Sequence, residues 1–183
     1  MAAELKNLSE HNPTLVPNAA HLSFGVVVSD YNPNITHALL DACYETLVQY
    51  GASPKQVYIW HVPGAFELPL AAKMLYQATH PDAVICLGCV IKGDTEHDKY
   101  INYAVSRAIM QLNMKTGTPF IFGVLTPNTL EQAQDRAGGK HGNKGTEAAI
   151  AAIQMAALNE HAQQIKQQEH EQLKAQLVAS LSE

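Results

Sequence analysis

Short apolar runs alternate along the chain with longer segments in which apolar residues recur every three or four positions. The short runs are rich in valine and isoleucine, which is typical of strands buried on both faces. They predict strands over residues 23–28, 56–62, 82–91 and 119–125. The longer segments predict helices over residues 35–51, 67–78, 99–117 and 146–164, with a short helix and a glycine-rich loop within residues 126–145.

This alternation predicts an α/β fold, a three-layer sandwich with a four-stranded parallel sheet flanked by helices on both faces. Ligands of such folds bind beyond the carboxyl ends of the strands. Polar stretches follow each predicted strand and mark the expected site: SDYN at 29–32, PGAFE at 63–67, GDTEH at 93–97 and TPNT at 126–129.

The two ends of the chain differ from the middle. Residues 1–22 lack periodicity and are interpreted as a flexible or neighbour-docked N-terminal arm, and residues 23–160 form the domain itself. Residues 161–183 are interpreted as a polar helical C-terminal extension, with sparse apolar positions such as Ile165 and Leu173. A frayed helical tail and a helix that binds a partner both fit this extension.

Composition narrows the class of protein. A formal net charge of -5 is unfavourable for nucleic-acid binding, and no apolar stretch approaches the length of a membrane span. The first 22 residues show no apolar core of a secretory signal. Cys86 and Cys89 have the spacing of a redox pair but lie in the apolar run AVICLGCVI, which favours buried small side chains. With Cys43 they fit a reducing cytoplasm.

His97 is the first candidate for chemistry. It follows the third predicted strand, close to Asp94, Thr95, Glu96 and Asp98. An imidazole titrates near neutral pH and therefore suits proton transfer. A catalytic histidine and an ordinary surface histidine both fit this position. No second His or Cys lies at ligand spacing nearby, so no metal site is expected around His97.

The stretch DRAGGKHGNKG at 135–145 is the second candidate. Its glycines allow a close backbone approach, and Arg136, Lys140 and Lys144 bring positive charge directly before a helix. This composition is typical of an anion site. A glycine-rich turn between helices, with solvated cations, is the alternative.

The stretch VPGAFELP at 62–69 is the third candidate. Pro63 and Gly64 predict a sharp turn out of the strand. Phe66 offers a face on which a flat ring can stack, and Glu67 can accept hydrogen bonds from ring N–H groups. The alternative is that Phe66 belongs to the core and Glu67 caps the next helix.

From Phe24 to Leu158 the chain resembles the 6,7-dimethyl-8-ribityllumazine synthase family. The resemblance rests on four stretches in the same order: VVVSDYN, VPGAFELP, GCVIKGDTEH and FGVLTPNTLEQAQDRAGGKHGNKG. It implies a flavodoxin-like fold and a transferase that condenses 5-amino-6-(D-ribitylamino)uracil with 3,4-dihydroxy-2-butanone 4-phosphate. Phosphate and water are released in this penultimate step of riboflavin biosynthesis, and no metal or redox cofactor is needed. The enzyme contributes mainly orientation and proton transfer.

The resemblance also implies roles for single residues. His97 matches the proton donor, and Asn32 matches a polar wall residue. The expected contacts of the butanone phosphate are Asp94, Thr95 and Arg136. The expected contacts of the aminouracil are Tyr31, Ala65, Phe66, Glu67, Cys89, Val90, Ile91, Phe122 and Lys144. In this family a contact such as that of Phe122 can come from a neighbouring subunit.

The chain departs from the family pattern in two places. Tyr31 stands where most members have Phe or Trp, which keeps a flat face. Asp98 and Lys99 follow the histidine where most members have an aromatic residue and then an acid, and Tyr100 returns to the usual aromatic. Since His97 is retained, activity is expected, and the departure concerns its surroundings.

The resemblance further implies self-association. Family members form homopentamers with active sites at subunit interfaces, and some pack into a 60-subunit icosahedral capsid. Extra residues before the last helix go with isolated pentamers, and RAGGKHGNKG has none, which favours the shell. Riboflavin synthase is a further candidate partner. A flavin-binding protein without catalysis and a purely structural shell remain the rival functions.

Overall fold

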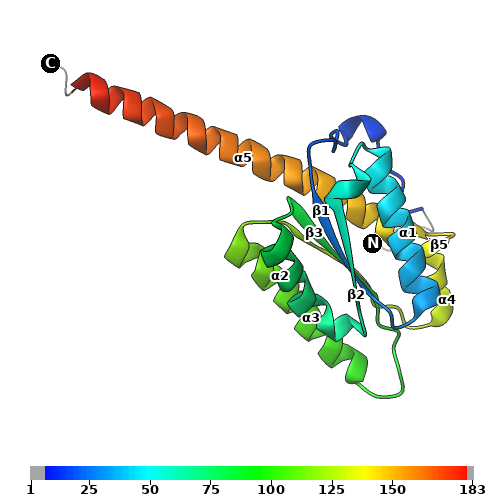
Figure 1. Cartoon of the computed structure of the whole chain (residues 1–183). Helices are drawn as coiled ribbons and strands as arrows, with labels where there is room; N and C mark the ends of the chain where they lie inside the picture. Colours follow the sequence, from blue (N-terminus) through cyan, green and yellow to red (C-terminus); the bar gives the residue numbers. More distant parts are fainter. Residues whose placement is uncertain (1–6, 181–183) are drawn as a thin grey trace, which may run out of the picture.

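The central sheet determines the architecture of the chain, which a computed structural model describes over residues 7–180 (Figure 1). Four parallel strands lie in the order β2-β1-β3-β4. Their bounds are β1 Phe24–Ser29, β2 Val57–Val62, β3 Ala83–Cys89 and β4 Phe120–Leu125. Helices cover both faces of this sheet, so the predicted three-layer α/β fold is confirmed.

Each face of the sheet has its own helices. On one face lie α1 Pro33–Gln49, α4 Leu130–Asp135 and α5 Lys144–Ser180. On the other face lie α2 Leu68–Thr79 and α3 His97–Thr116. Three 3-10 turns complete the elements, at Pro13–Leu15, Pro54–Gln56 and Ala65–Glu67.

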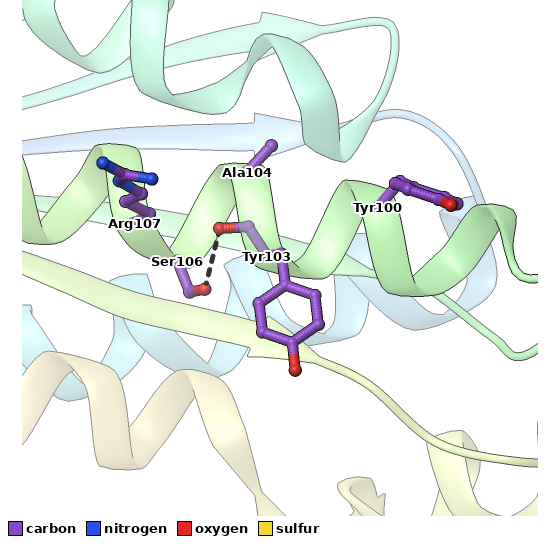
Figure 2. A pocket seen from close by; sticks show the side chains of 5 residues that line it. All are labelled: Tyr100, Tyr103, Ala104, Ser106 and Arg107. Carbon is purple, nitrogen blue, oxygen red and sulfur yellow. Dashed lines mark hydrogen bonds between the residues drawn. The ribbon is translucent and has the colours of Figure 1, made fainter.

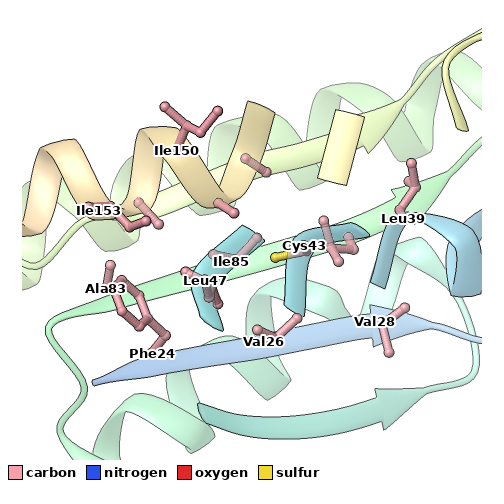
Figure 3. Close-up of a cluster of buried hydrophobic side chains, with 14 of the residues drawn as sticks. Phe24, Val26, Val28, Leu39, Cys43, Leu47, Ala83, Ile85, Ile150 and Ile153 are labelled. Carbon is pink, nitrogen blue, oxygen red and sulfur yellow. The ribbon is translucent and has the colours of Figure 1, made fainter. Parts of the chain in front are cut away.

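The apolar runs form central strands because both of their faces are buried. All residues of β1 and β3 are buried. Alternate side chains enter opposite cores, so that Val26 and Val28 join the α1–α5 core and Val27 joins the α2–α3 core. Figure 3 shows the first of these cores, in which Ile150 and Ile153 of α5 lie over the sheet.

Gly145 allows α5 to begin directly against α1. A Cβ atom at this position would overlap the backbone carbonyl of Leu39, which cannot move as a side-chain tip can. We expect Gly145→Ala to lower the free energy of unfolding by about 1–3 kcal/mol, the range of overpacked cores. Urea denaturation measures this change. Gly93→Ala is the matched control, because a Cβ there meets nothing within 4 Å, and an equal loss in both variants would contradict the explanation.

Two local predictions were wrong. Helix α3 begins at His97, two residues before the predicted start at 99, so this histidine lies in a first helical turn and not in the strand exit. The predicted glycine-rich loop contains a short antiparallel pair, β5 Ala137–Gly139 and β6 Gly142–Asn143. Positive φ angles of 109° at Gly138 and 81° at Gly142 allow this tight reversal.

The N-terminal segment from residue 7 lies against its own chain. Ala19 and Leu22 are buried in the α1–α5 core, and the Ser9 hydroxyl donates to the Asn143 carbonyl oxygen at 3.0 Å. Residues 1–6 lie outside the described part, and docking of the arm on a neighbour stays a prediction.

The C-terminal segment continues α5 away from the sheet (Figure 1). Side chains from His161 to Lys174 are exposed, as the polar composition predicts, and residues 181–183 lie outside the described part. A helix over this extension agrees with both alternatives stated for it. Within residues 7–180, none of the helices combines the length and the apolar character that crossing a membrane requires.

Candidate active site

A cavity of about 580 Å³ opens at the carboxyl ends of β1, β2 and β3. After β1 the chain forms β2 on one side of that strand and then β3 on its other side. The strand order therefore reverses between β1 and β3, and the cavity lies at this topological switch point. Its lining residues are Tyr31, Asn32, Gly64, Ala65, Phe66, Glu67, Cys89, Val90, Ile91, Lys92, Gly93, Thr95, His97, Asp98 and Ile101. Three of the four predicted polar stretches therefore meet in one place.

Hydrogen bonds hold the loops around this cavity in place. Asn32 has a left-handed backbone with φ 60°, and its side-chain amide donates to the Cys89 carbonyl oxygen at 3.1 Å. This contact ties the end of β1 to the end of β3. The amide of Val90 donates to the Leu125 carbonyl oxygen at 2.8 Å, which continues the sheet beyond its last regular pair.

Two aromatic side chains line the cavity and remain open to solvent. Tyr31 is 69% exposed and Phe66 is 60% exposed, so the alternative of Phe66 as a core residue is wrong. Leu68, which is fully buried, fills the core position instead. Glu67 precedes α2 but its side chain forms no capping hydrogen bond, so its carboxylate is available to the cavity.

His97 lines the cavity from the first turn of α3 and is exposed. Its backbone N–H lies 3.4 Å from the Thr95 hydroxyl, which accepts the bond and orders the start of the helix. Of the two residues that depart from the family pattern, Asp98 lines the cavity, and its Oδ1 atom is buried without a hydrogen-bond partner in the described structure. Lys99 instead forms an ion pair with Glu96 at the surface.

Arg136 and Lys144 line a different hollow, of about 280 Å³, at the end of β4. The carboxylate of Glu147 pairs with both cations, at 2.6 Å from Arg136 Nη2 and 3.1 Å from Lys144 Nζ. The second terminal nitrogen of the Arg136 guanidinium, Nη1, donates to the His141 carbonyl oxygen at 2.7 Å. Within one described chain, the expected phosphate ligands of the two loops are therefore not brought together.

Two further predicted residues lie outside the cavity lining. Asp94 is an exposed residue of the turn before α3, next to Thr95, which does line the cavity. Phe122 lies in β4, half-buried against the α2–α3 core, and lines neither the cavity nor the Arg136 hollow.

Some residues in or beside these hollows escaped the sequence analysis. Lys92 lies directly after the predicted strand, and Ile101 lies four residues after His97, on the same side of a helix. Glu147 lies three residues after Lys144, a spacing that favours an ion pair. These signals could have been recognised once the start of each helix was fixed.

Burial suppresses the reactivity of the three cysteines. It raises the pKa of Cys43 and Cys86 to about 12 and the pKa of Cys89 to about 11. Because the thiolate is the reactive form, we expect all three thiols to react slowly with a disulfide reagent at pH 8 and rapidly in urea. Absorbance of the released thiol measures both rates. A fast native reaction of Cys86 would contradict its burial.

The sequence profile of the family described as 6,7-dimethyl-8-ribityllumazine synthase matches residues 21–160. A relative of that name from Flavobacterium johnsoniae is 48% identical over 162 residues, which cover 88% of this chain and 85% of the relative. Another from Parabacteroides distasonis is 46% identical, covering 85% of this chain and 97% of the relative. A third from Porphyromonas gingivalis is 47% identical, covering 86% and 98%.

Proposed function

The chain belongs to the 6,7-dimethyl-8-ribityllumazine synthase family, and we propose that the cavity at the β1–β3 switch point is the pyrimidine half of its active site. Membership gives the chain the family's transferase activity in riboflavin biosynthesis, the condensation of 5-amino-6-(D-ribitylamino)uracil with 3,4-dihydroxy-2-butanone 4-phosphate. The observation that supports the site is the meeting of two exposed aromatic rings, a carboxylate and His97 around one cavity.

Mixing the two substrates with the protein tests the activity. Formation of the lumazine is followed by its absorbance, and a rate no faster than the uncatalysed background would overturn the function. Binding of the aminouracil alone tests the cavity separately, because Phe66→Ala should weaken it through the loss of stacking by about 0.5–1.5 kcal/mol.

In this proposal the cavity contacts the pyrimidine ring both on its faces and along its edges. Tyr31 and Phe66 offer ring faces, and the Glu67 carboxylate accepts hydrogen bonds from N–H groups. Cys89 at the end of β3 and the following Val90 and Ile91 offer backbone groups, and Ala65 leaves room beside them. Phe122 and Lys144 are proposed as further aminouracil contacts, although neither lines this cavity within one chain.

The second substrate is proposed to bind at the side of the cavity where α3 begins, and the proton transfers are proposed to occur there. Asp94 and Thr95 are proposed to hold the butanone phosphate at the start of α3, where the helix dipole favours an anion. Arg136 is proposed to bind the phosphate group itself. His97 is proposed to transfer protons during Schiff-base formation and phosphate loss.

A second copy of the chain is proposed to complete this site. Support comes from the separation of Arg136 and Lys144, which line a different hollow from His97. If a neighbour presented its Arg136 hollow to the His97 cavity, the cation and the phosphate loop would come from two chains. Such a head-to-tail contact closes into a ring when the rotation between neighbours is a whole fraction of a turn, one fifth for the proposed homopentamer.

The outer face of α3 is a candidate for that contact. Figure 2 shows Tyr100, Tyr103 and Arg107 along this helix. Tyr100 is 72% exposed and Tyr103 is 78% exposed, and Met110 and Met114 continue the exposed apolar positions at helical spacing. An apolar strip of this kind is typical of a covered surface.

The proposal extends to a 60-subunit shell that could hold riboflavin synthase, in the cytoplasm. Light scattering and negative-stain microscopy of the full chain test the assembly. Particles of shell mass are expected, and a species of pentamer or decamer mass alone would overturn the shell while leaving the activity untouched.

A further inference from the structure

Three ionisable side chains converge outside the cavity, near the carboxyl ends of β1 and β2. Asp30 follows β1, His37 lies in α1 and His61 lies in β2. The Asp30 Oδ1 atom lies 3.0 Å from His37 Nε2 and 2.8 Å from His61 Nδ1. All three donor atoms lie within 4.8 Å of one another.

We propose that Asp30, His37 and His61 form a binding site for a divalent transition-metal ion, for which Zn²⁺ is the best fit. Two imidazole nitrogens and one carboxylate oxygen are a common ligand set for Zn²⁺, with water in the fourth position. The site is separate from the proposed active site, because none of the three residues lines the cavity.

Two of the three separations between ligand atoms are close to those of a metal-bound state, and the two ring nitrogens lie within 4.8 Å of each other. In a tetrahedral zinc site with bonds of about 2.0–2.1 Å, neighbouring ligand atoms lie about 3.3 Å apart. The two oxygen–nitrogen distances here are 3.0 and 2.8 Å, so separations only a few tenths of an ångström larger are needed. Both ring nitrogens already face the same oxygen, and an ion between them would replace the protons that the imidazoles now share with it.

The backbone fixes the three ligands relative to one another. The amide of Asp30 donates to the Val62 carbonyl oxygen at 2.8 Å, directly beside His61. His61 of β2 is paired with Val28 of β1 in the sheet. His37 lies in the second turn of α1, which packs against β1. Two of the three ligands thus lie in regular elements, and the loop residue Asp30 is held by its backbone bond to the end of β2.

Access and charge also favour a cation. Each side chain is 47–48% exposed, which leaves a path for the ion and room for water ligands. The Asp30 carboxylate supplies negative charge directly at the point where the two imidazoles meet.

Metal titration of the full chain tests the proposal, with no polyhistidine tag and after removal of metal by a chelator. Co²⁺ is followed by its visible absorption and Zn²⁺ by calorimetry, both in excess Mg²⁺ to exclude weak carboxylate binding. We expect one ion per chain. His37→Gln and His61→Gln should each weaken binding by more than about 100-fold, beyond the loss typical of second-shell changes.

The matched control is His21→Gln. His21 is also exposed and lies 2.9 Å from a carboxylate oxygen of Glu160, but within residues 7–180 no third potential ligand completes a cluster with this pair. This variant should bind Zn²⁺ as the parent chain does. Equal weakening by His21→Gln, or unchanged binding by a His37→Gln/His61→Gln double variant, would overturn the site.

Thermal unfolding provides a second readout. His61 lies 31 residues after Asp30 in the sequence, so the unfolded chain does not hold the three ligands together as the folded chain does. Zn²⁺ should therefore raise the Tm of the parent chain and of His21→Gln but not of His61→Gln. Circular dichroism of the metal-free variants establishes that each is folded, and an equal Tm rise in all variants would contradict the proposal.

Discussion

Replacing His97 with alanine is expected to lower kcat roughly 10²- to 10³-fold while changing both KM values little. The side chain lines the cavity at the start of α3 but forms no part of either apolar core, so its loss removes a proton-transfer group without a cavity in the protein. Steady-state rates, corrected for the uncatalysed reaction, measure the effect at saturating concentrations of both substrates.

Lys99→Ala is the matched control for this variant. Lys99 lies in the same helical turn, but its ammonium group pairs with Glu96 away from the cavity. It should retain the parent kcat. If His97→Ala also retained it, the proton-transfer role would be wrong although the family and the cavity would stand. If Asp98→Ala instead had the larger effect, the proton would pass through the carboxylate that lines the same cavity.

The sheet and the edge at which the cavity opens could be predicted because their causes are local in sequence. Strands buried on both faces require continuous apolar runs, and the runs ending at Val28 and Ile91 stand out from the polar stretches around them. The polar residues that follow them meet because parallel strands end at one edge. The family prediction rests on motifs at these strand ends. It is confirmed by the match of the family profile to residues 21–160.

The start of α3 and the end of the glycine-rich stretch could not be predicted in the same way. The α3 boundary depends on the Thr95 hydroxyl near the His97 amide, and the β5–β6 pair depends on backbone angles that only its glycines adopt easily. Neither produces an apolar period. Boundaries of this kind are set by single hydrogen bonds and are weakly encoded in residue type.

Contacts between distant segments were also beyond the sequence pattern. Glu147 pairs with Arg136 across the β5–β6 hairpin, and His61 approaches Asp30 only because β1 and β2 are neighbours in the sheet. The roles of single residues remain predictions for a related reason. A motif indicates which side chains take part in the reaction. It does not indicate whether those side chains lie together within one chain, and Arg136 lines a different hollow from His97.

Replacing Arg136 with alanine is expected to raise the KM for the butanone phosphate by roughly 10- to 150-fold, the range for losing a hydrogen bond to a charged group. The KM for the aminouracil should change little. Since Arg136 also pairs with Glu147, the variant leaves that carboxylate beside Lys144 alone, and a loss of stability could imitate a loss of binding. Arg136→Ala/Glu147→Gln also removes the charge of the carboxylate that had paired with Arg136, and it should show the same KM as Arg136→Ala.

Mixing the two impaired variants then distinguishes a shared site from a site within one chain. His97→Ala and Arg136→Ala chains are unfolded together in equal amounts and refolded, so that assemblies of the chain contain both. The activity is measured at a butanone phosphate concentration far below the KM of Arg136→Ala, where each variant alone is slow. In a head-to-tail ring, about one quarter of the interfaces would join an intact His97 to an intact Arg136, and that fraction of the parent activity should return. If both residues acted from the same chain, each chain would carry one defect and no activity would return, because no arrangement of the chains restores a complete site. Recovery would thus explain why the Arg136 hollow and the His97 cavity are separate in one chain.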